Sequence, residues 1–504
     1  MGLAIGIDLG TSTSAAAVYR RGKVESLPIE GKKIMPSVIS CKPDGTTLIG
    51  HSAKSRLYID PLNTISSSKR HMGDEGKTYT VSGRSMTPVD AAKEILSKIK
   101  AEAEKYLGES VNDAVITIPA YFTSEQREAT KKAGELAGFR VLRLLSEPTA
   151  AAIAYGLDKE KDQTIMVYDL GGGTFDISIL KVEHNHFDVV AVDGDSLLGG
   201  DDFDNKIVQY ILRQVSVSQS LQGSQEGSIS MQRLKEAVEE AKKELSVSDV
   251  ADITIPDIFN THIDEELTID KFNQMVEPLL KKTTDKMKEV LQAAGLTKRD
   301  ISRVILVGGS TRMRAVREAV TKEIKQPFIA DNVDEIVAHG AAIMAANLSA
   351  PEKDMAPVPI EVQEAVPHSF GVGMFLNDVW SVKHLISRND KLPAMGSTLG
   401  LTRYPYQTEV DLPVYRQESI VPDEESFLGK LTISVRAQKE PVALSSIFEL
   451  DENGILVLSS SELPDYSPII RQYADTGEVN IPLLRDMIDS KQIQVKSVKI
   501  DTTK

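Results

Sequence analysis

The sequence contains very little cysteine. Cys41 is the only cysteine among 504 residues, so an intrachain disulfide cannot form. The same count excludes a cysteine-based zinc site and the disulfide framework of small secreted proteins. We therefore expect a protein of a reducing compartment, the cytoplasm.

The sequence also lacks long apolar runs and a recognisable signal peptide. No stretch approaches the roughly 18 apolar residues that a membrane-spanning helix requires. The first residues, MGLAIGIDLG, lead directly into a strand pattern that contains Asp8, without the basic region and apolar core of a signal peptide. We expect no membrane association.

Basic residues are outnumbered by acidic ones. The chain has 58 lysines and arginines against 73 aspartates and glutamates, and its formal net charge is -15. Nucleic acids and anionic membrane surfaces are bound through a basic footprint. Neither is expected as the main partner, and the acidity is explained by solubility.

Up to about residue 348, short apolar strand patterns alternate with long helical patterns. This order is typical of an α/β protein whose sheets are covered by helices. Apolar residues at helical spacing predict amphipathic helices over 89–106 and 230–246. The motifs IGIDLGTSTS and MVYDLGGGTFD share a strand, Asp-Leu-Gly and hydroxylated residues, which indicates a duplicated lobe.

The pattern changes after residue 348. Residues 349–366 are rich in proline and have no helical period, which is typical of a linker. Residues 367–504 contain short alternating segments, and DENG between two apolar runs is a hairpin signal. We expect an α/β domain over 1–348, a linker over 349–366 and an all-β domain over 367–504 with one short helix at LLRDMIDS.

Three consecutive glycines follow the apolar strand in YDLGGGTFDISIL. Glycines let backbone N–H groups approach a ligand and form an anion-binding concavity. One such turn would suit a tight hairpin equally well. Two such turns in one chain predict a polyphosphate that is held from both sides, with threonine and serine hydroxyls as additional donors. The two turns comprise Gly10, Thr11, Ser12 and Thr13, and Gly171, Gly172, Gly173 and Thr174.

Asp8, Asp169 and Asp176 flank these two turns. A carboxylate beside a phosphate implies a cation between them. Mg²⁺ keeps most of its water and needs few carboxylates, so aspartates that hold its hydration shell are expected. Capping of a strand end explains one aspartate well and all three poorly.

A third glycine turn occurs in ILVGGSTRMRAV, between a strand and a helix. Gly308 and Gly309 permit close approach of a flat ring, on which Arg312 is placed to stack. Ser310 or Thr311 is expected to cap the helix that follows.

A fourth turn, in SLLGGDDFDNKIV, combines Gly199 and Gly200 with a helix start at Asp201 or Asp202. A helix amino terminus presents backbone donors. This turn is therefore a further candidate for phosphate contact.

The four turns, in this order, resemble the ATPase domain of the seventy-kilodalton heat-shock chaperones of the DnaK type, in the actin and sugar-kinase superfamily. NTISSSKRHMG, ITIPAYFTSEQREATKKAGELAGF, LLSEPTAAAIAYGL and GGSTRM are each close to that family's sequences. The resemblance covers about the first 348 residues. It implies a bilobed actin-like ATPase domain with duplicated ribonuclease-H-like lobes, which binds ATP or ADP with Mg²⁺ and K⁺.

The resemblance also implies catalytic roles. Lys69 would position the attacking water and the γ-phosphate, Glu147 would lie near that water, and the Thr174 hydroxyl would lie beside the γ-phosphate. Asp8 and Asp169 would surround the magnesium ion, and Asp176 would neighbour a monovalent cation.

Further residues match the family's adenosine pocket and its signalling elements. Pro119 and Arg127 would report the nucleotide state to the second domain. The adenosine pocket would be formed by Glu239, Lys242, Lys243, Ser246, Gly308, Gly309, Ser310, Arg312 and Asp334.

The carboxy-terminal domain resembles the family less closely. VPHSFGVGM, HLISRNDKLPA, SFLGKL and FELDENGILVLSS follow the order of its β-sandwich peptide-binding domain, whose cleft would clamp an extended apolar peptide. Val372, Met374, Phe375 and Val410 are the candidates for lining this cleft, although packing in the sandwich core explains the same residues. Unfolded or extended apolar segments are the implied clients, with a J-domain co-chaperone and a nucleotide exchange factor as partners.

The sequence departs from the family pattern in several places. No long helical segment follows the β domain, so we expect a short member without the helical lid, either by nature or by truncation. The linker PVPIEVQEAVP has Glu361, Gln363 and Glu364 where apolar residues are usual, which puts interdomain coupling in doubt. Gly400 and Arg403 fall beside the expected peptide channel and predict a different peptide specificity. The low-complexity segment 216–230 suggests a shortened, mobile replacement for a structured part of the ATPase domain.

The leading interpretation is an ATP-dependent chaperone in which slow hydrolysis in the first domain controls peptide binding in the second. The alternative is a nucleotide-dependent regulatory or client-specific module with weakened coupling. A sugar kinase would have no appended sandwich, and an actin-like filament protein would not explain residues 360–504.

Overall fold

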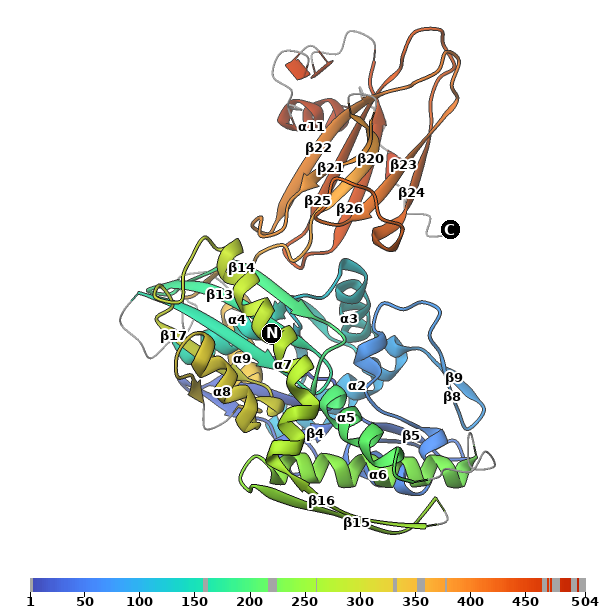
Figure 1. The fold of residues 1–504 in the computed structure, drawn as a ribbon. Coiled ribbons are helices and arrows are strands. Elements are labelled where there is room, and N and C mark those ends of the chain that lie inside the picture. Colours follow the sequence, from blue (N-terminus) through green and yellow to red (C-terminus); the bar gives the residue numbers. More distant parts are fainter. Residues whose placement is uncertain are drawn as a thin grey trace. The chain divides into compact units, whose positions relative to one another are not determined.

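Figure 1 shows the computed structural model of the chain as a ribbon. The residues described are 3–156, 162–215, 224–259, 261–329, 333–350, 359–376, 379–464, 469–470, 472–473, 481–490 and 496–497. The chain divides into two compact units, Met1–Gln363 and Glu364–Lys504. None of the helices in these described ranges combines the length and apolar character needed to cross a bilayer.

The first unit is built around two sheets of six strands each. In the first sheet the strand order is β11-β10-β1-β2-β3, and β4 pairs with β2. Strands β1 and β2 are antiparallel, whereas β10 and β11 run parallel to β1. The strands are β1 (Leu3–Leu9), β2 (Thr13–Arg20), β3 (Lys23–Ser26), β4 (Ile34–Pro36), β10 (Val111–Ile118) and β11 (Arg140–Ser146).

The second sheet repeats this topology. Its order is β18-β17-β12-β13-β14-β19, with β12, β13 and β14 antiparallel and β17 and β18 parallel to β12. The duplicated lobe that the two Asp-Leu-Gly motifs predicted is therefore confirmed. The strands are β12 (Gln163–Leu170), β13 (Phe175–Glu183), β14 (His186–Asp195), β17 (Arg303–Val307), β18 (Phe328–Ile329) and β19 (Glu361–Gln363).

Smaller sheets extend each half. They are formed by β5 (Ile39–Cys41), β6 (Thr47–Ile49) and β7 (Thr64–Ile65), by β8 (Tyr79–Val81) and β9 (Arg84–Met86), and by β15 (Val250–Ile258) and β16 (Thr261–Thr268). Cys41 is buried and free. It contributes to a small apolar core with Ile65 and Val81.

Helices cover the two large sheets. The α-helices are α1 (His51–Lys54), α2 (Pro88–Leu107), α3 (Ser124–Leu136), α4 (Glu147–Gly156), α5 (Gly200–Leu212), α6 (Gln225–Glu244), α7 (Ile269–Ala293), α8 (Arg314–Glu323) and α9 (Ile336–Leu348). Short 3-10 turns are η1 (Ser55–Tyr58), η2 (Pro61–Asn63), η3 (Ser68–His71) and η5 (Gly309–Arg312). The helices predicted over 89–106 and 230–246 are confirmed as α2 and α6.

Helix α6 starts earlier than its apolar pattern suggested. It begins at Gln225, with the Ser224 side chain as the amino-terminal cap. The part of the low-complexity segment from Gln225 to Ser230 is therefore helical, and Gly227 and Ser230 in it are buried. The rest of the segment, 216–223, lies outside the described residues.

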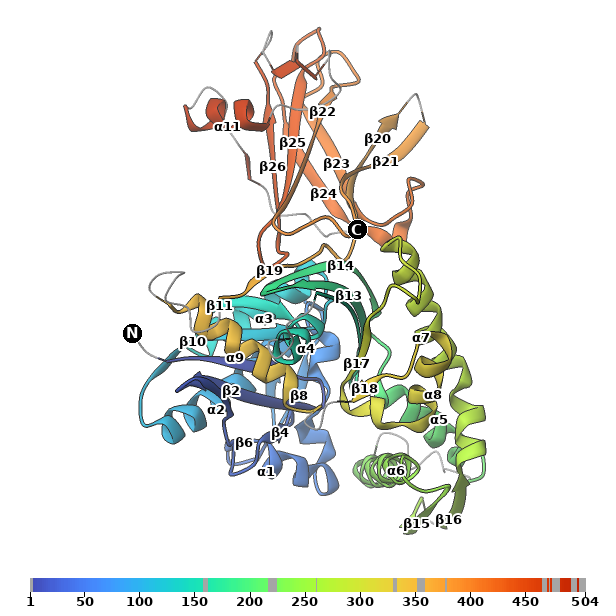
Figure 2. The same ribbon diagram turned by 90° about the vertical axis from the view of Figure 1, so that its left-hand side faces the viewer.

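Helices α4 and α9 cross between the two lobes. Helix α9 packs on β1, β2 and β10 of the first sheet, and α4 packs on β12 and β13 of the second. Figure 2 shows α4 and α9 next to each other in the first unit. A side chain at Gly340 of α9 would lie 1.8 Å from the carbonyl oxygen of Ala150 in α4. The two backbones therefore meet with no side chain between them.

The second unit is a sandwich of two antiparallel sheets, β21-β20-β23-β24 and β22-β25-β26-β27. Residues from both sheets, among them Phe370, Val414, Leu431 and Phe448, share one apolar core. The DENG hairpin is confirmed, because β25 and β26 pair directly across it. The elements are β20 (Phe370–Leu376), β21 (Val379–Ile386), β22 (Ala394–Leu401), β23 (Glu409–Arg416), η7 (Glu424–Ser426), β24 (Phe427–Ser434), β25 (Ala443–Leu450), β26 (Leu456–Glu462), α11 (Ile481–Asp489) and β27 (Lys496–Ser497).

The segment expected to be the linker contributes a strand to the first unit. Residues 351–358 of it lie outside the described residues. Strand β19 pairs in parallel with β14, with Val362 opposite Phe187, and the Glu361 N–H donates to the Asn185 carbonyl at 3.0 Å. Polar residues thus extend the edge of the second sheet, because main-chain pairing does not require apolar side chains.

Candidate functional site

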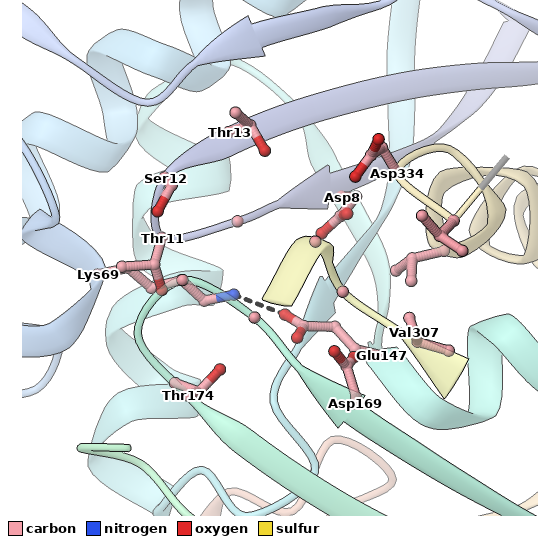
Figure 3. A pocket seen from close by; sticks show the side chains of 17 residues that line it. Asp8, Thr11, Ser12, Thr13, Lys69, Glu147, Asp169, Thr174, Val307 and Asp334 are labelled. Carbon is pink, nitrogen blue, oxygen red and sulfur yellow. Dashed lines mark hydrogen bonds and ion pairs between the residues drawn. The ribbon is translucent and has the colours of Figure 1, made fainter. Parts of the chain in front are cut away.

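The two glycine turns face each other across one pocket (Figure 3). The first turn joins β1 to β2, and the second joins β12 to β13. These are corresponding positions in the two duplicated sheets. The pocket spans about 550 Å³ including its open mouth. It is lined by Asp8, Gly10, Thr11, Ser12, Thr13, Lys69, Glu147, Asp169, Gly171, Gly172, Thr174, Val307, Gly308, Gly309, Val333, Asp334 and Val337.

The glycines allow backbone segments to pack directly against each other. A side chain at Gly199 would lie 2.4 Å from the backbone nitrogen of Gly173. Gly308 has φ 83°, and a side chain there would lie 2.4 Å from the carbonyl oxygen of Leu170. Only glycine fits both positions. The third and fourth turns therefore pack directly against the segment 170–173 that carries the second turn.

Lys69 and Glu147 form a buried ion pair inside the pocket. The Lys69 Nζ donates to Glu147 Oε1 at 2.6 Å, and the exposed fractions of the two residues are 5% and 8%. Lys69 comes from η3, whereas Glu147 is the first residue of α4. Figure 3 shows the pair extending into the space between the two turns, with Asp8, Asp169 and Thr174 around it. Two segments far apart in sequence thus place opposite charges in the pocket between the two turns.

The three aspartates carry strongly perturbed carboxyl groups. Burial, reinforced by the negative charge of Glu147, raises the pKa of Asp8 to about 7 and the pKa of Asp176 to about 7. Burial and the neighbouring carboxylates also raise the pKa of Asp169 well above its usual range. Burial without a compensating charge disfavours the ionised form of a carboxyl group. A nearby cation would therefore stabilise the ionised form of these three groups and lower their pKa values.

The donor set fits a hydrated magnesium ion. Within the described ranges, no three acidic, histidine or cysteine side chains converge closely enough to ligate a metal by themselves. A hydrated Mg²⁺ needs only one or two carboxylates, because water and phosphate oxygens complete its shell. Asp8 and Asp169 line the pocket and would hold the ion. Asp176 lies behind them: its Oδ1 accepts from the Tyr121 N–H at 2.9 Å, and its buried Oδ2 has no protein hydrogen-bond partner among the described residues.

The residues expected to hold adenosine are only partly brought together. Gly308, Gly309 and Asp334 line the pocket. Glu239, Lys242 and Lys243 of α6, and Ser246 just after that helix, lie outside its lining. Lys242 is buried, and its Nζ lies 2.8 Å from Asp204 Oδ2 and 3.2 Å from the Gly200 carbonyl.

The other charged residues of this group also bond within the protein. Lys243 pairs with Glu239 at 2.8 Å. Arg312 makes a bidentate pair with Asp334, at 3.1 and 2.6 Å. An aromatic ring that stacks on Arg312 would therefore meet a guanidinium already held in place.

Ser310 and Thr311 do not cap the helix that follows the third turn. Helix α8 begins at Arg314, with Met313 at its cap position and no side-chain cap hydrogen bond. The Ser310 hydroxyl donates to the Gly171 carbonyl at 2.9 Å, and the Thr311 hydroxyl donates to the Gly308 carbonyl at 2.7 Å. The prediction of a cap was wrong because both hydroxyls stabilise the glycine turns. At the fourth turn, α5 starts at Gly200, and Asp202 accepts from the Gly199 N–H at 2.8 Å.

Pro119 lies in the connection between β10 and α3, and Arg127 lies in the first turn of α3. Arg127 is buried, and its guanidinium donates to the carbonyls of Phe122 and Ala120 at 3.0 and 2.9 Å. The same connection bonds Asp176 through the Tyr121 N–H. Residues 119–123 thus connect the first lobe to the carboxylate behind the pocket.

Sequence reasoning missed Arg70. Its guanidinium donates to the Gly173 carbonyl, the Leu197 carbonyl and Asp202, so it ties η3 to the second and fourth turns. Thr117, which donates to Asp8 at 3.2 Å, was missed too. The position of Arg70 directly after Lys69 and that of Thr117 in the strand beside β1 are the signals that could have indicated them.

The peptide-binding candidates of the second unit differ in exposure. Val372 is 1% exposed and lies in the sandwich core, as the alternative interpretation of these residues holds. Met374 and Val410 are partly buried against apolar clusters. Phe375 is 47% exposed. Of the four, Phe375 is the most exposed.

The geometry of the pocket can be compared with a known family. The sequence model of the family described as Hsp70 protein matches residues 4–467. This match covers both large sheets of the first unit and both sheets of the second except β27. The chain therefore belongs to the Hsp70 family, whose members are ATP-binding chaperones and typically ATPases.

Proposed function

We propose that the first unit binds ATP with Mg²⁺ between its two glycine turns and hydrolyses it slowly. We further propose that the nucleotide state controls binding and release of extended apolar peptides by the second unit. The single observation that carries the proposal is the Lys69–Glu147 pair, held at 2.6 Å in a pocket lined by both glycine turns. In this proposal residues 1–348 form the nucleotide-binding domain, residues 349–366 the linker and residues 367–504 the peptide-binding domain.

The chemistry follows from this arrangement. Phosphoryl transfer to water needs positioning and charge neutralisation more than covalent catalysis. The Lys69 ammonium supplies a positive charge beside the γ-phosphate position, and the Glu147 carboxylate accepts a hydrogen bond from the attacking water. When bound, Mg²⁺ neutralises the phosphate oxygens. Thr174 adds a hydroxyl donor from the second turn.

A single-turnover experiment tests the proposal. The full chain is loaded with ATP and Mg²⁺, and hydrolysis is followed with and without an unfolded peptide. Release of a fluorescent peptide is then followed after ATP is added. Hydrolysis that accelerates with peptide, together with faster peptide release on ATP, would support the proposal. A chain that does not hydrolyse ATP would contradict it.

A second candidate function rests on the linker. Glu361, Gln363 and Glu364 interrupt its apolar character, so a regulatory or client-specific module with weakened coupling is the alternative. This alternative would be favoured if the hydrolysis rate does not change with peptide and the rate of peptide release does not change with ATP. A J-domain co-chaperone and a nucleotide exchange factor are proposed as partners in either case.

A further inference from the structure

An exposed aromatic and cationic cluster is formed by residues of β20 and β21 and by the connection that follows β22. The guanidinium carbon of Arg403 lies 4.0 Å from the centroid of the Phe375 ring, which lies 5.0 Å from the ring of Trp380. Phe375 and Trp380 are 47% and 40% exposed. Because Arg403 follows β22 while both aromatic residues belong to the β20–β21 hairpin, the contact joins separate parts of the sandwich. We call these three residues the Arg403 cluster.

The connection that carries Arg403 is held in a defined conformation. Gln407 Oε1 accepts from the backbone N–H groups of Arg403 and Tyr404 at 3.0 and 3.3 Å. The Gln407 amide donates to the Glu409 carbonyl at 2.7 Å, and the Tyr406 N–H donates to the Gln438 carbonyl at 2.7 Å. These bonds limit the positions of the Arg403 backbone, so a ligand meets a preorganised group.

Within the described residues, which do not include Asp378 between β20 and β21, no carboxylate forms an ion pair with Arg403. Other cations of the same sandwich are paired, Lys430 with Asp411 at 2.7 Å and Arg436 with Glu462 at 2.7 Å. A guanidinium that stacks on an aromatic ring keeps its edge donors available for a carboxylate.

Exposed apolar side chains are close to the cluster in sequence. Leu376 and Val379 are exposed near the end of the β20–β21 hairpin, and Leu401 and Tyr404 are exposed beside Arg403. An extended peptide could therefore find apolar contacts and one fixed positive charge within a short distance. Alternate residues of an extended strand lie on the same face, roughly 7 Å apart.

We propose that the Arg403 cluster selects extended apolar peptides that carry an acidic residue within two positions of the apolar anchor. This inference rests on the proposed peptide binding by the second unit and names the class of peptide. The peptide carboxylate accepts from the Arg403 guanidinium while the neighbouring apolar side chain packs on Phe375 and Trp380. The formal net charge of the chain, -15, favours basic peptides at long range, so a preference for acidic peptides would have to come from this local charge.

Fluorescence anisotropy on the full chain with ADP tests the proposal. Three labelled heptapeptides share a leucine-rich centre and differ only in their flanking residues, which are glutamate, glutamine or lysine. We expect the glutamate peptide to bind about two- to fivefold more tightly than the glutamine peptide, and the lysine peptide to bind most weakly. High salt should reduce the difference because it screens exposed charges.

Two variants assign the preference to Arg403. In Arg403→Gln the glutamate and glutamine peptides should bind equally, with binding of the glutamine peptide retained. Lys439→Gln removes the same charge from an exposed position whose neighbour, Gln438, bonds the same connection, and should keep the preference. If both variants lose the preference for the glutamate peptide equally, the preference comes from the summed positive charge of this surface. That result would overturn the assignment to Arg403.

The outcomes separate this inference from the proposed function. Binding of the glutamine peptide without any preference for glutamate would overturn the role of the cluster and leave peptide binding supported. Failure of all three peptides to bind would overturn peptide binding itself and the inference with it.

Discussion

Lys69 Nζ donates a hydrogen bond to Glu147 Oε1 at 2.6 Å, and this pair lies between the two glycine turns of the first unit. Breaking a buried ion pair by removing one partner is more costly than removing both, because a lone buried charge remains. The pair is thus expected to affect the free energy of unfolding as well as the rate of hydrolysis. Both quantities must be measured when Lys69 or Glu147 is replaced.

We expect Lys69→Ala to remove hydrolysis while nucleotide binding is nearly retained. Loss of a preorganised charge at the reacting phosphate should lower the single-turnover rate by about 100-fold or more. Nucleotide affinity, measured by calorimetry, should change little because the glycine turns remain. Lys32→Ala, at an exposed position, is the matched control. Survival of hydrolysis would show that the role given to Lys69 is wrong.

The same variant should lower the free energy of unfolding by about 3–5 kcal/mol, because Glu147 would lose its buried partner. The double variant Lys69→Met with Glu147→Gln removes both charges and should recover much of that stability without recovering hydrolysis. Chemical denaturation of the two variants measures the difference. A double variant no more stable than Lys69→Ala would contradict this account of the pair.

We expect Gly199→Ala to weaken nucleotide binding. The new methyl group would lie 2.4 Å from the Gly173 nitrogen and 2.5 Å from its α-carbon, so the second turn must move. Overpacking of this kind lowers the free energy of unfolding by about 1–3 kcal/mol. Gly76→Ala is the control, because its nearest contact would be an ordinary 3.4 Å to Asp74 Oδ1. Equal nucleotide affinities in the two variants would argue against contact between the turns.

Binding of a magnesium nucleotide should release protons near pH 7. Asp8 and Asp176 have pKa values raised to about 7 by burial, so each is partly protonated at that pH. A cation stabilises the carboxylates and lowers their pKa. Affinity should therefore rise as the pH increases from about 5 to 7.

Titration calorimetry in buffers with different ionisation enthalpies counts these protons. Asp176→Asn should release fewer protons than the unmodified chain. An observed binding enthalpy that does not depend on the buffer near pH 7 would contradict the assigned protonation states.

The pairing of β19 with β14 should depend on main-chain hydrogen bonds rather than on charge. The Glu361 carboxylate lies 3.7 Å from His186 Nδ1, and both side chains are about half exposed. Exposed pairs contribute only about 0–1 kcal/mol. Glu361→Gln should therefore leave hydrogen exchange at residues 361–363 slow, whereas Val362→Pro should make it fast because proline disrupts a strand. If hydrogen exchange at residues 361–363 is already fast in Glu361→Gln, the pairing depends on the side chains rather than on the main chain.

The repeated topology could be predicted from the sequence because both lobes keep the same strand, Asp-Leu-Gly and turn. The helices α2 and α6 were predicted because their apolar residues follow a helical period. The start of α6 was not, since serine and glutamine around Gln225 carry no apolar pattern and the Ser224 cap becomes evident only from its hydrogen bond.

In the candidate site, too, residues in local motifs could be predicted, whereas those defined by tertiary contacts could not. The glycines and aspartates were indicated by local motifs, and the structure gathers them around one pocket. The hydroxyls of Ser310 and Thr311 were assigned wrongly, because their carbonyl acceptors are set by how the third turn folds and packs against the second turn. The contacts of Arg70 and the stacking of Arg403 on Phe375 likewise join residues far apart in sequence, which no short motif encodes.

The crossing of α4 and α9 is formed by main chain alone at Gly340. A β-carbon there would lie 1.8 Å from the Ala150 carbonyl oxygen and 2.5 Å from its carbonyl carbon, so any larger residue would push the two helices apart. Because α9 packs on the first sheet and α4 on the second, such a change would also alter the spacing between the two lobes.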